Sequence, residues 1–428
     1  MITANHKIPG LVIKDHEFQV PLDHEKPEQR QISVFAREVA ALEYAEKQMP
    51  WMLFLNGGPG FACSRPESRS GWLARALQEY RVLLLDQRGT GLSTPVTHQT
   101  LSALKDAQAQ AEYLSHFRAD NIVRDAEFIR KELVGEKWTV LGQSFGGFCI
   151  LTYLSFAPEG LQAALITGGI PPIGQKVDDV YRATYKRVLE QNRLYFERYP
   201  GDAEKLKRIY EYVETNNVCT PAGERLSVRR LQQLGIHLGF TGGFERLHYL
   251  IESAFVSTGS GTDISYIFTK SADAMLEFNT NPIYVLLHEA IYCEGQASDW
   301  SAERVRSEFP QFNPETNSPP LFTGEMVYPW MLDEYSCLAK IKDAAQIVAK
   351  HRDWPRLYNL EQLQQNEVPT AAAVYLDDMY VEWDYSQQLA RQIPKLRLWA
   401  TNEYMHSGLR DDGERIIDRL LAMVNGAI

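Results

Sequence analysis

Clusters of positive charge are missing from this sequence. Its 428 residues include 44 lysines and arginines against 55 aspartates and glutamates, a formal net charge of −11, and no basic run occurs. Nucleic acids and anionic membrane surfaces bind proteins through gathered cations. We therefore expect neither nucleic acid nor membrane among the partners of this protein. The acidic balance is compatible with a cationic substrate, but the solubility that net charge confers explains it equally well.

Long apolar runs are also absent. No stretch approaches the roughly 18 to 20 apolar residues of a membrane-spanning helix. The segment "MITANHKIPGLVIKDHEF" has no apolar core of the length that a secretory signal peptide needs. The five cysteines are widely scattered, and no pair of them has the spacing of metal ligands. The sequence therefore predicts a cytoplasmic protein with reduced thiols and without a metal or other cofactor.

Apolar strands alternate with helical patterns in the first third of the chain and again near its end. Because such strands are buried on both faces, the pattern predicts a mostly parallel sheet with helices on both sides. Strands are predicted at 31–40, 51–56, 82–86, from Trp138 to the residue before Ser144, and at 164–170, 370–378 and 396–401. Helices are predicted at 71–80, at about 104–134 and after Ser144. The long interval from 171 to 350 has mostly helical patterns, so we expect one sheet interrupted by a large helical insertion.

The stretch "VLGQSFGGFCI" puts a serine at the junction of a predicted strand and a predicted helix. Gly142 and Gly146 flank Ser144 at the spacing of a nucleophile elbow, in which a sharp turn exposes the serine hydroxyl and only small neighbours fit. The start of the following helix supplies free backbone N–H groups for an oxyanion. The alternative is a glycine-rich turn with an idle serine. The strand before it and the helix after it favour the nucleophile.

A second glycine loop and a late histidine complete the chemistry that acyl transfer requires. Gly57 and Gly58, in "LNGGPG", follow a buried strand and can turn a backbone N–H toward a substrate carbonyl. His406 is the only histidine beyond residue 351, and it follows the last predicted strand, where a general base belongs. Asp377 and Asp378 close the strand before it, and only one of them can point to the histidine. The alternatives are a tight turn, a surface histidine and turn-capping aspartates.

Together these stretches resemble the proline iminopeptidases, also called prolyl aminopeptidases. The resemblance rests on "GGPG", on "DQRGTGLS" (86–93), on "GQSFGG" (142–147) and on the late Asp–His pair, and it covers nearly the whole chain. The stretches "VPLDH", "FTGEMVYPW" and "DDMYVEWDYS" resemble the longer branch of that family. The resemblance implies an α/β-hydrolase fold with a large helical cap inserted after the sixth strand. Residues 1–170 and 351–428 would form the catalytic domain, and 171–350 the cap.

The resemblance also implies roles for particular residues. Ser144 would be the nucleophile and His406 the base. Asp378 would be the acid, because the family's acid lies 28 residues before its histidine, and Asp377 remains the second choice. Arg88, in the "DQRG" stretch, is interpreted as a structural residue that pairs with a carboxylate, with substrate binding as the lesser alternative.

The oxyanion donors implied by the resemblance are the backbone N–H groups of Phe145 and of Gly57 or Gly58. The family usually has histidine before "GGPG" and often has tryptophan after the serine, whereas this chain has Asn56 and Phe145. Both departures concern the walls of the pocket more than the triad. We therefore expect them to change the substrate preference more than the activity.

An aminopeptidase must also bind a free ammonium group, and the family uses two glutamates of the cap for this purpose. The candidates here are Glu289 in "LLHEAIY" and Glu325 in "TGEMVYPW", each a charged residue inside an apolar or aromatic run, with Glu245 as a weaker third. The alternative is that these are ordinary solvated helix charges.

The leading hypothesis is a serine aminopeptidase that removes N-terminal proline from peptides through an acyl-enzyme. One alternative is a cap-bearing α/β-hydrolase that acts as an esterase or amidase on a small acyl substrate. A binding protein without catalytic activity is the alternative from another class. The ordered Ser, Asp and His argue against that last possibility.

Overall fold

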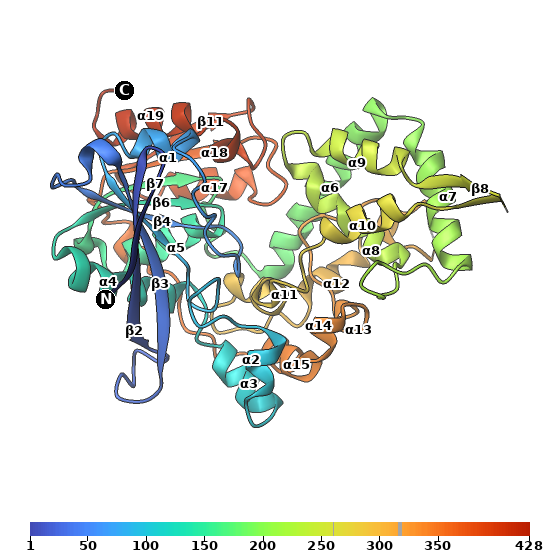
Figure 1. Cartoon of the computed structure of the whole chain (residues 1–428), viewed down its shortest axis with the longest axis horizontal. Helices are drawn as coiled ribbons and strands as arrows, with labels where there is room; N and C mark the ends of the chain where they lie inside the picture. The colour runs from blue at the N-terminus through green and yellow to red at the C-terminus, as the bar shows by residue number, and fades with distance from the viewer. Residues whose placement is uncertain (260, 316–318) are drawn as a thin grey trace.

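Within residues 1–259, 261–315 and 319–428, which the computed structural model describes, the largest element is a nine-stranded sheet (Figure 1). Its spatial order is β1-β2-β3-β5-β4-β6-β7-β10-β11. The strands are β1 (Ile2–Ile8), β2 (Leu11–Pro21), β3 (Gln31–Ala41), β4 (Trp51–Leu55), β5 (Arg81–Leu85), β6 (Trp138–Gln143), β7 (Leu161–Thr167), β10 (Thr370–Tyr375) and β11 (Leu396–Thr401). The contacts from β1 through β3 to β5 are antiparallel, and those from β5 to β11 are parallel.

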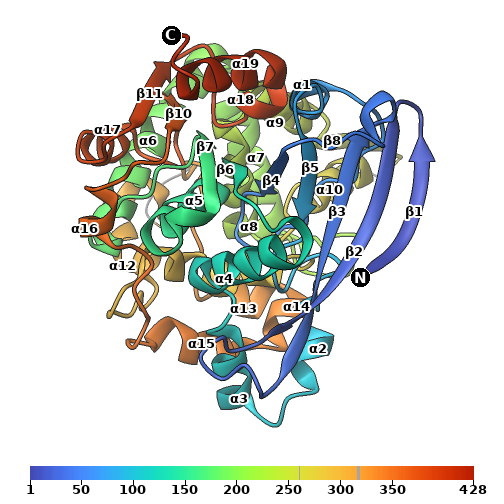
Figure 2. The same ribbon diagram turned by 90° about the vertical axis from the view of Figure 1, so that its left-hand side faces the viewer.

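Helices cover both faces of the sheet, as the sequence predicts. Successive side chains of β4 alternate between two apolar cores. Leu53 and Leu55 belong to the core beneath α4 (Ala119–Ile129) and α5 (Phe145–Phe156). Met52 and Phe54 belong to the core beneath α1 (Gly71–Ala76) and α19 (Gly413–Val424). In Figure 2, α4 and α5 lie near the middle of the view in front of strands, and α1 and α19 lie at the top.

The chain leaves the sheet between β7 and β10 and forms a mostly helical region, seen on the right and at the bottom of Figure 1. Its helices are α6 (Val177–Arg198), α7 (Asp202–Thr215), α8 (Val228–Gln232), α9 (Gly243–Glu252), α10 (Tyr266–Ala274), α11 (Pro282–Leu287), α12 (Ser301–Arg306), α13 (Met331–Glu334), α14 (Ser336–Ala339), α15 (Lys342–Lys350) and α16 (Leu360–Leu363). It also contains a hairpin of β8 (Phe255–Thr258) and β9 (Gly261–Ile264), which the sequence analysis does not predict. The remaining helices are α2 (His98–Ser102), α3 (Ala107–Leu114), α17 (Trp383–Ala390) and α18 (Gly408–Asp411).

Two details differ from the sequence-based expectation. In chain order the insertion follows the seventh strand and not the sixth, since β1 and β2 precede the five strands predicted ahead of it. The single helix expected at about 104–134 is interrupted between α3 and α4, where Arg118 has an extended backbone. The buried guanidinium group of Arg118 donates to the carbonyl oxygens of Ala290 (2.8 Å) and Cys293 (2.6 Å) in the insertion. A break in the helix thus ties the insertion to the sheet domain.

Candidate active site

Ser144 lies where β6 turns into α5, with a left-handed backbone conformation (φ 54°, ψ −122°). A non-glycine residue in this region is strained, and such strain is typical of a nucleophile elbow. The turn leaves no room beside it: a Cβ on Gly142 would collide with the backbone of Gly146, and a Cβ on Gly146 would collide with the carbonyl oxygen of Leu55. The tight strand-to-helix turn predicted from "GQSFGG" is present.

The "GGPG" loop lies directly against this turn. A Cβ on Gly57 would lie 3.1 Å from the Cβ of Ser144. In the described part of the chain, the backbone N–H groups of Phe145, Gly57 and Gly58 donate to no other group, so they are free to meet a substrate oxygen. The side chain of Asn56 holds the loop by donating to the carbonyl oxygen of Ala62 at 3.0 Å. The loop and the turn together can form an oxyanion hole.

The "DQRG" stretch stabilises this loop through hydrogen bonds of its buried side chains. The buried carboxylate of Asp86 accepts hydrogen bonds from the backbone N–H of Cys63 (3.1 Å) and from Arg65 (2.9 Å). Arg88 is fully buried, and its Nε donates to Asp125 at 2.7 Å. These contacts support the structural interpretation of Arg88 and leave its guanidinium group no path to a substrate.

Asp378 and His406 form a buried pair. The Nδ1 atom of His406 lies 2.7 Å from Oδ2 of Asp378, and the other carboxylate oxygen accepts from the backbone N–H groups of Tyr380 (2.8 Å) and Val381 (3.1 Å). Asp377 is exposed. β10 ends at Tyr375, and the turn that follows directs Asp378 inward, so the geometry favours Asp378 over Asp377 as the partner of the histidine.

Glycine contacts bring the histidine to the elbow. The N–H of Ser144 donates to the carbonyl oxygen of Thr167 at 2.9 Å. A Cβ on the next residue, Gly168, would lie 3.2 Å from Nδ1 of His406. Burial by itself would lower the pKa of His406, but the carboxylate of Asp378 outweighs burial, and the net effect raises the pKa above its ordinary value. Ser144, His406 and Asp378 thus come from three separate loops at one edge of the sheet.

Glu325 is the predicted amine ligand that the fold brings toward this edge. Tyr284 donates its hydroxyl hydrogen to Oε1 of Glu325 at 2.7 Å. Tyr284 itself lies over the "GGPG" loop, with its ring 5.4 Å from that of Phe61. The Glu325 carboxylate contributes to the raised pKa of His406, so its charge acts on the candidate base.

Glu289 is placed differently. Its side chain is buried, and its two carboxylate oxygens accept from the backbone N–H groups of Ser301 (3.1 Å) and Ala302 (2.9 Å) at the start of α12. Burial raises the pKa of Glu289 to about 7, against the opposing effect of those two N–H groups. A carboxylate engaged in this way caps a helix, and the geometry does not support the prediction that it binds a substrate amine.

This placement predicts a pH-dependent stability. The folded-state pKa of Glu289 is about 7 against an ordinary value of 4.5, so its stabilisation is complete below about pH 4.5 and is lost as the pH rises to about 7. The loss in the free energy of unfolding between low and high pH amounts to about 3 kcal/mol, and Glu289→Gln is expected to abolish it. The measurement is the free energy of unfolding in urea at pH 5 and pH 8. Glu245→Gln serves as the control, and an unchanged difference between the two pH values in Glu289→Gln would contradict the assignment.

Glu245, the third candidate, lies far out on the helical region. Its carboxylate pairs with Arg198 at 2.7 Å and accepts from the hydroxyl of Tyr199 at 3.3 Å. A partly exposed ion pair of this kind is a surface feature. The structure therefore brings Glu325 toward the candidate site, places Glu245 in a surface ion pair, and engages the carboxylate of Glu289 at the start of α12.

Three residues near Glu325 and His406 were not predicted from the sequence as site residues: Tyr284, His288 and Tyr380. The ring of Tyr380 lies 4.5 Å from that of His406, and the ring of His288 lies 4.8 Å from that of Tyr284. The spacing of Tyr284 and His288, four residues apart at a helix end, is the signal that could have placed them on one face. In "LLHEAIY", the sequence-based prediction assigns a role to Glu289 and none to His288.

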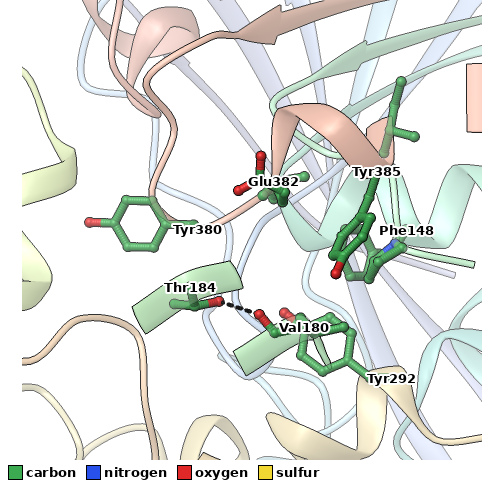
Figure 3. A pocket seen from close by; sticks show the side chains of 10 residues that line it. Phe148, Val180, Thr184, Tyr292, Tyr380, Glu382 and Tyr385 are labelled. Carbon is green, nitrogen blue, oxygen red and sulfur yellow. Dashed lines mark hydrogen bonds between the residues drawn. The ribbon is translucent and has the colours of Figure 1, made fainter. Parts of the chain in front are cut away.

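A small hollow lies beside the Asp378 turn, between α5, α6 and α17 (Figure 3). It is lined by Phe148, Ile170, Pro172, Val180, Thr184, Tyr292, Tyr380, Val381, Glu382 and Tyr385. In Figure 3 the rings of Phe148, Tyr292 and Tyr385 gather on one side, and Tyr380 lies on the other. Its one carboxylate, Glu382, is paired with Arg187 at 2.6 Å. None of the eight predicted site residues lines this hollow, so it adjoins the reacting groups but does not contain them.

Across the described ranges, no group of three or more His, Cys, Asp or Glu side chains is arranged to hold a metal ion. Among the same residues, none of the helices has the length and apolar character needed to cross a membrane.

Comparison with known proteins gives three findings. A family model described as the alpha/beta hydrolase fold matches residues 50–412. The proline iminopeptidase of Aeromonas sobria is 48% identical over 421 residues, which cover 98% of this chain and 98% of that protein. The proline iminopeptidase aneH of Aspergillus aculeatus is 36% identical over 432 residues, which cover 98% of this chain and 95% of that protein. Both likenesses extend through the helical region as well as the sheet.

Proposed function

Because the chain belongs to the proline iminopeptidases, enzymes of the α/β-hydrolase fold, we propose that it releases N-terminal proline from peptides by Ser-His-Asp catalysis. The observation that carries the proposal is the buried pair of His406 and Asp378 beside the strained turn at Ser144. In keeping with the family, residues 1–170 and 351–428 are the catalytic domain, and 171–350 are the cap.

The reaction follows from the roles of these groups. The hydroxyl oxygen of Ser144 attacks the carbonyl carbon of the N-terminal residue, and Nε2 of His406 takes its proton. Asp378 holds Nδ1 of the imidazole and stabilises the imidazolium as it forms. His406 then gives the proton to the departing peptide amine, and the prolyl ester on Ser144 is hydrolysed by water in the reverse sequence of proton transfers.

The backbone supplies the oxyanion site. The N–H of Phe145 at the start of α5, and that of Gly57 or Gly58, meet the oxygen that becomes negative in the tetrahedral intermediate. The dipole of α5 favours negative charge at the same point. Neither donor depends on a side chain, so the substitution of phenylalanine for the family's usual tryptophan leaves this part of the mechanism intact.

Glu325 binds the substrate's ammonium group. A carboxylate fixed by the Tyr284 hydroxyl is a suitable partner for a cation that must lose its hydration on entering the site. Binding the amine in this way also explains why an N-terminal residue, and not an internal one, would be cleaved: an internal residue carries no charge for Glu325 to hold.

The test of the function is a comparison of Pro-, Ala- and Leu-naphthylamides with p-nitrophenyl acetate. A proline aminopeptidase hydrolyses the Pro-naphthylamide with the highest kcat/KM of the amides. Hydrolysis of the ester without hydrolysis of Pro-naphthylamide would favour a small-acyl esterase. A failure to turn over any of the four compounds would favour a binding protein.

Glu325→Gln is expected to lower kcat/KM for Pro-naphthylamide by a factor equivalent to about 2–4 kcal/mol of transition-state stabilisation. The reason is that the ammonium then lacks a charged partner in a pocket that excludes water. The activity toward p-nitrophenyl acetate, which carries no cation, should remain near that of the wild type. The ratio of the two activities is the measured quantity.

A second readout of the same variant separates binding from structure. Glu325 helps to raise the pKa of His406, so its removal lowers that pKa. Because the base must be neutral to accept a proton, the acid limb of the ester pH profile should move to lower pH. An unchanged activity ratio and an unmoved acid limb would rule out the proposed place of Glu325.

A further inference from the structure

His288 is a buried imidazole whose hydrogen-bonding capacity is unused. Its side chain is 2% exposed, and Nδ1 has no hydrogen-bond partner in the described part of the chain. Nε2 likewise makes no hydrogen bond there. A buried polar group without a partner costs stability, and one in a native fold calls for an explanation. Packing among the rings of Tyr284 and Tyr292 accounts for its shape but not for its two nitrogens.

The position of Nε2 supplies an explanation for that nitrogen, whereas Nδ1, which carries the ring hydrogen when Nε2 accepts, keeps no partner in the described part of the chain. Nε2 lies 3.8 Å from Oε2 of Glu325, which is too far for a hydrogen bond. The other carboxylate oxygen is already engaged by the hydroxyl of Tyr284. Two acceptors that each take a hydrogen bond of about 2.8 Å from one tetrahedral nitrogen lie about 4.5 Å apart. The 3.8 Å between Nε2 of His288 and Oε2 of Glu325 is about 0.7 Å shorter than that separation, so both hydrogen bonds form once either side chain moves by less than about 1 Å.

The gap also lies on the side of the reacting groups. His288 follows α11, and a Cβ on Gly60 of the "GGPG" loop would lie 2.8 Å from the backbone nitrogen of Tyr284 in the same helix. A substrate whose carbonyl meets this loop therefore has its amino group within reach of the segment that carries His288. Burial lowers the pKa of His288, which keeps the ring neutral and able to accept a hydrogen bond at neutral pH.

We propose that Nε2 of His288 accepts one hydrogen bond from the substrate's ammonium group while Glu325 accepts the other. The inference rests on the proposed aminopeptidase function and gives this chain an amine site made of one carboxylate and one imidazole. A protonated N-terminal proline is a secondary ammonium with two N–H bonds, which these two acceptors satisfy. A primary ammonium would keep a third N–H unpaired, so the arrangement suits an imino acid.

The experiment pairs a substrate change with a residue change. In N-methylproline naphthylamide the ammonium keeps its charge but has a single N–H, so one acceptor is left without a donor. The wild-type enzyme should lose about 10- to 100-fold in kcat/KM on N-methylation, the effect of one hydrogen bond to a charged group. In His288→Asn, whose amide is too short to reach the gap, the Pro substrate should lose a similar factor, and N-methylation should then cost less than about three-fold.

Two further variants separate binding from folding. His288→Gln extends an amide oxygen to about the place of Nε2 and should recover most of the activity that His288→Asn loses. His248→Asn removes a cap histidine that pairs with Asp202 at 2.7 Å, away from the gap, and should leave the N-methylation effect as in the wild type. Hydrolysis of p-nitrophenyl acetate should be unchanged in His248→Asn, and in the two His288 variants it should fall much less than hydrolysis of the Pro substrate does.

Two results would contradict the proposed role of His288. An N-methylation effect of equal size in the wild type and in His288→Asn would show that His288 takes no hydrogen bond from the amine. Equal losses toward the amide and the ester would show a structural role instead. If the wild-type enzyme fails to hydrolyse Pro-naphthylamide, the proposed function itself fails, which is a distinct outcome from the loss of this inference alone.

Discussion

Replacing Ser144 with alanine is expected to lower kcat for Pro-naphthylamide by roughly 10⁴-fold or more, while the fold remains intact. In the proposed mechanism the hydroxyl oxygen is the atom that forms the acyl-enzyme, and alanine has no group that can substitute for it. Alanine fits the turn at least as well as serine does, because the strained backbone and the flanking glycines are unaffected. Steady-state kinetics and a thermal melt on the same preparation measure the two expectations.

A labelling experiment and a matched serine sharpen this test. A serine-directed phosphonate should modify the wild-type enzyme at Ser144 and should leave Ser144→Ala unlabelled. Ser155→Ala is the control, because Ser155 lies on the same helix and donates only to the carbonyl oxygen of Leu151 at 2.7 Å. Wild-type turnover in Ser144→Ala would refute the elbow assignment.

His406→Ala and Asp378→Asn should each lower kcat by roughly 10³-fold or more, because the members of a triad act as a unit. The carboxylate of Asp378 holds Nδ1 of His406 at 2.7 Å and so leaves Nε2 for the proton of the serine. An amide at position 378 cannot hold the ring in that tautomer with the same strength. Both losses should affect amide and ester substrates alike, since the triad serves both reactions.

The neighbouring aspartate provides the control for this prediction. Asp377 is exposed and lies one residue before Asp378, so Asp377→Asn changes the local charge and leaves the histidine pair in place. Its kcat should stay within a few-fold of the wild type. A large loss in Asp377→Asn with a small loss in Asp378→Asn would reverse the assignment of the acid.

The predicted losses divide the site into two parts. Changes at Ser144, His406 and Asp378 should abolish both amide and ester hydrolysis, whereas changes at Glu325 and His288 should lower kcat/KM mainly for substrates with a free amine. The first group comes from loops at the edge of the sheet, and the second comes from the helical insertion. This division explains why an insertion is retained in an enzyme whose bond-breaking chemistry belongs to the sheet.

The sequence by itself determined the fold class and the residues that are expected to react at the sheet edge. Period-two and buried-strand patterns give β4, β5, β6, β7, β10 and β11, because local apolar periodicity reflects burial directly. The "GQSFGG" turn is readable for the same reason: sterically crowded turns require glycine at fixed offsets from the serine. Chain order restricted the base to His406 and the acid to two neighbouring aspartates.

Only the tertiary structure decided which glutamate faces the site. Glu289 and Glu325 look alike in sequence, each a charge within an apolar run. The carboxylate of Glu289 caps α12, whereas that of Glu325 accepts from Tyr284, which lies over the "GGPG" loop. Contacts between segments far apart in the chain set this difference, and no local periodicity records them. For the same reason the sequence did not predict His288. Its proposed role depends on the 3.8 Å gap between its Nε2 and Oε2 of Glu325, a residue 37 positions away, and not on the neighbouring sequence.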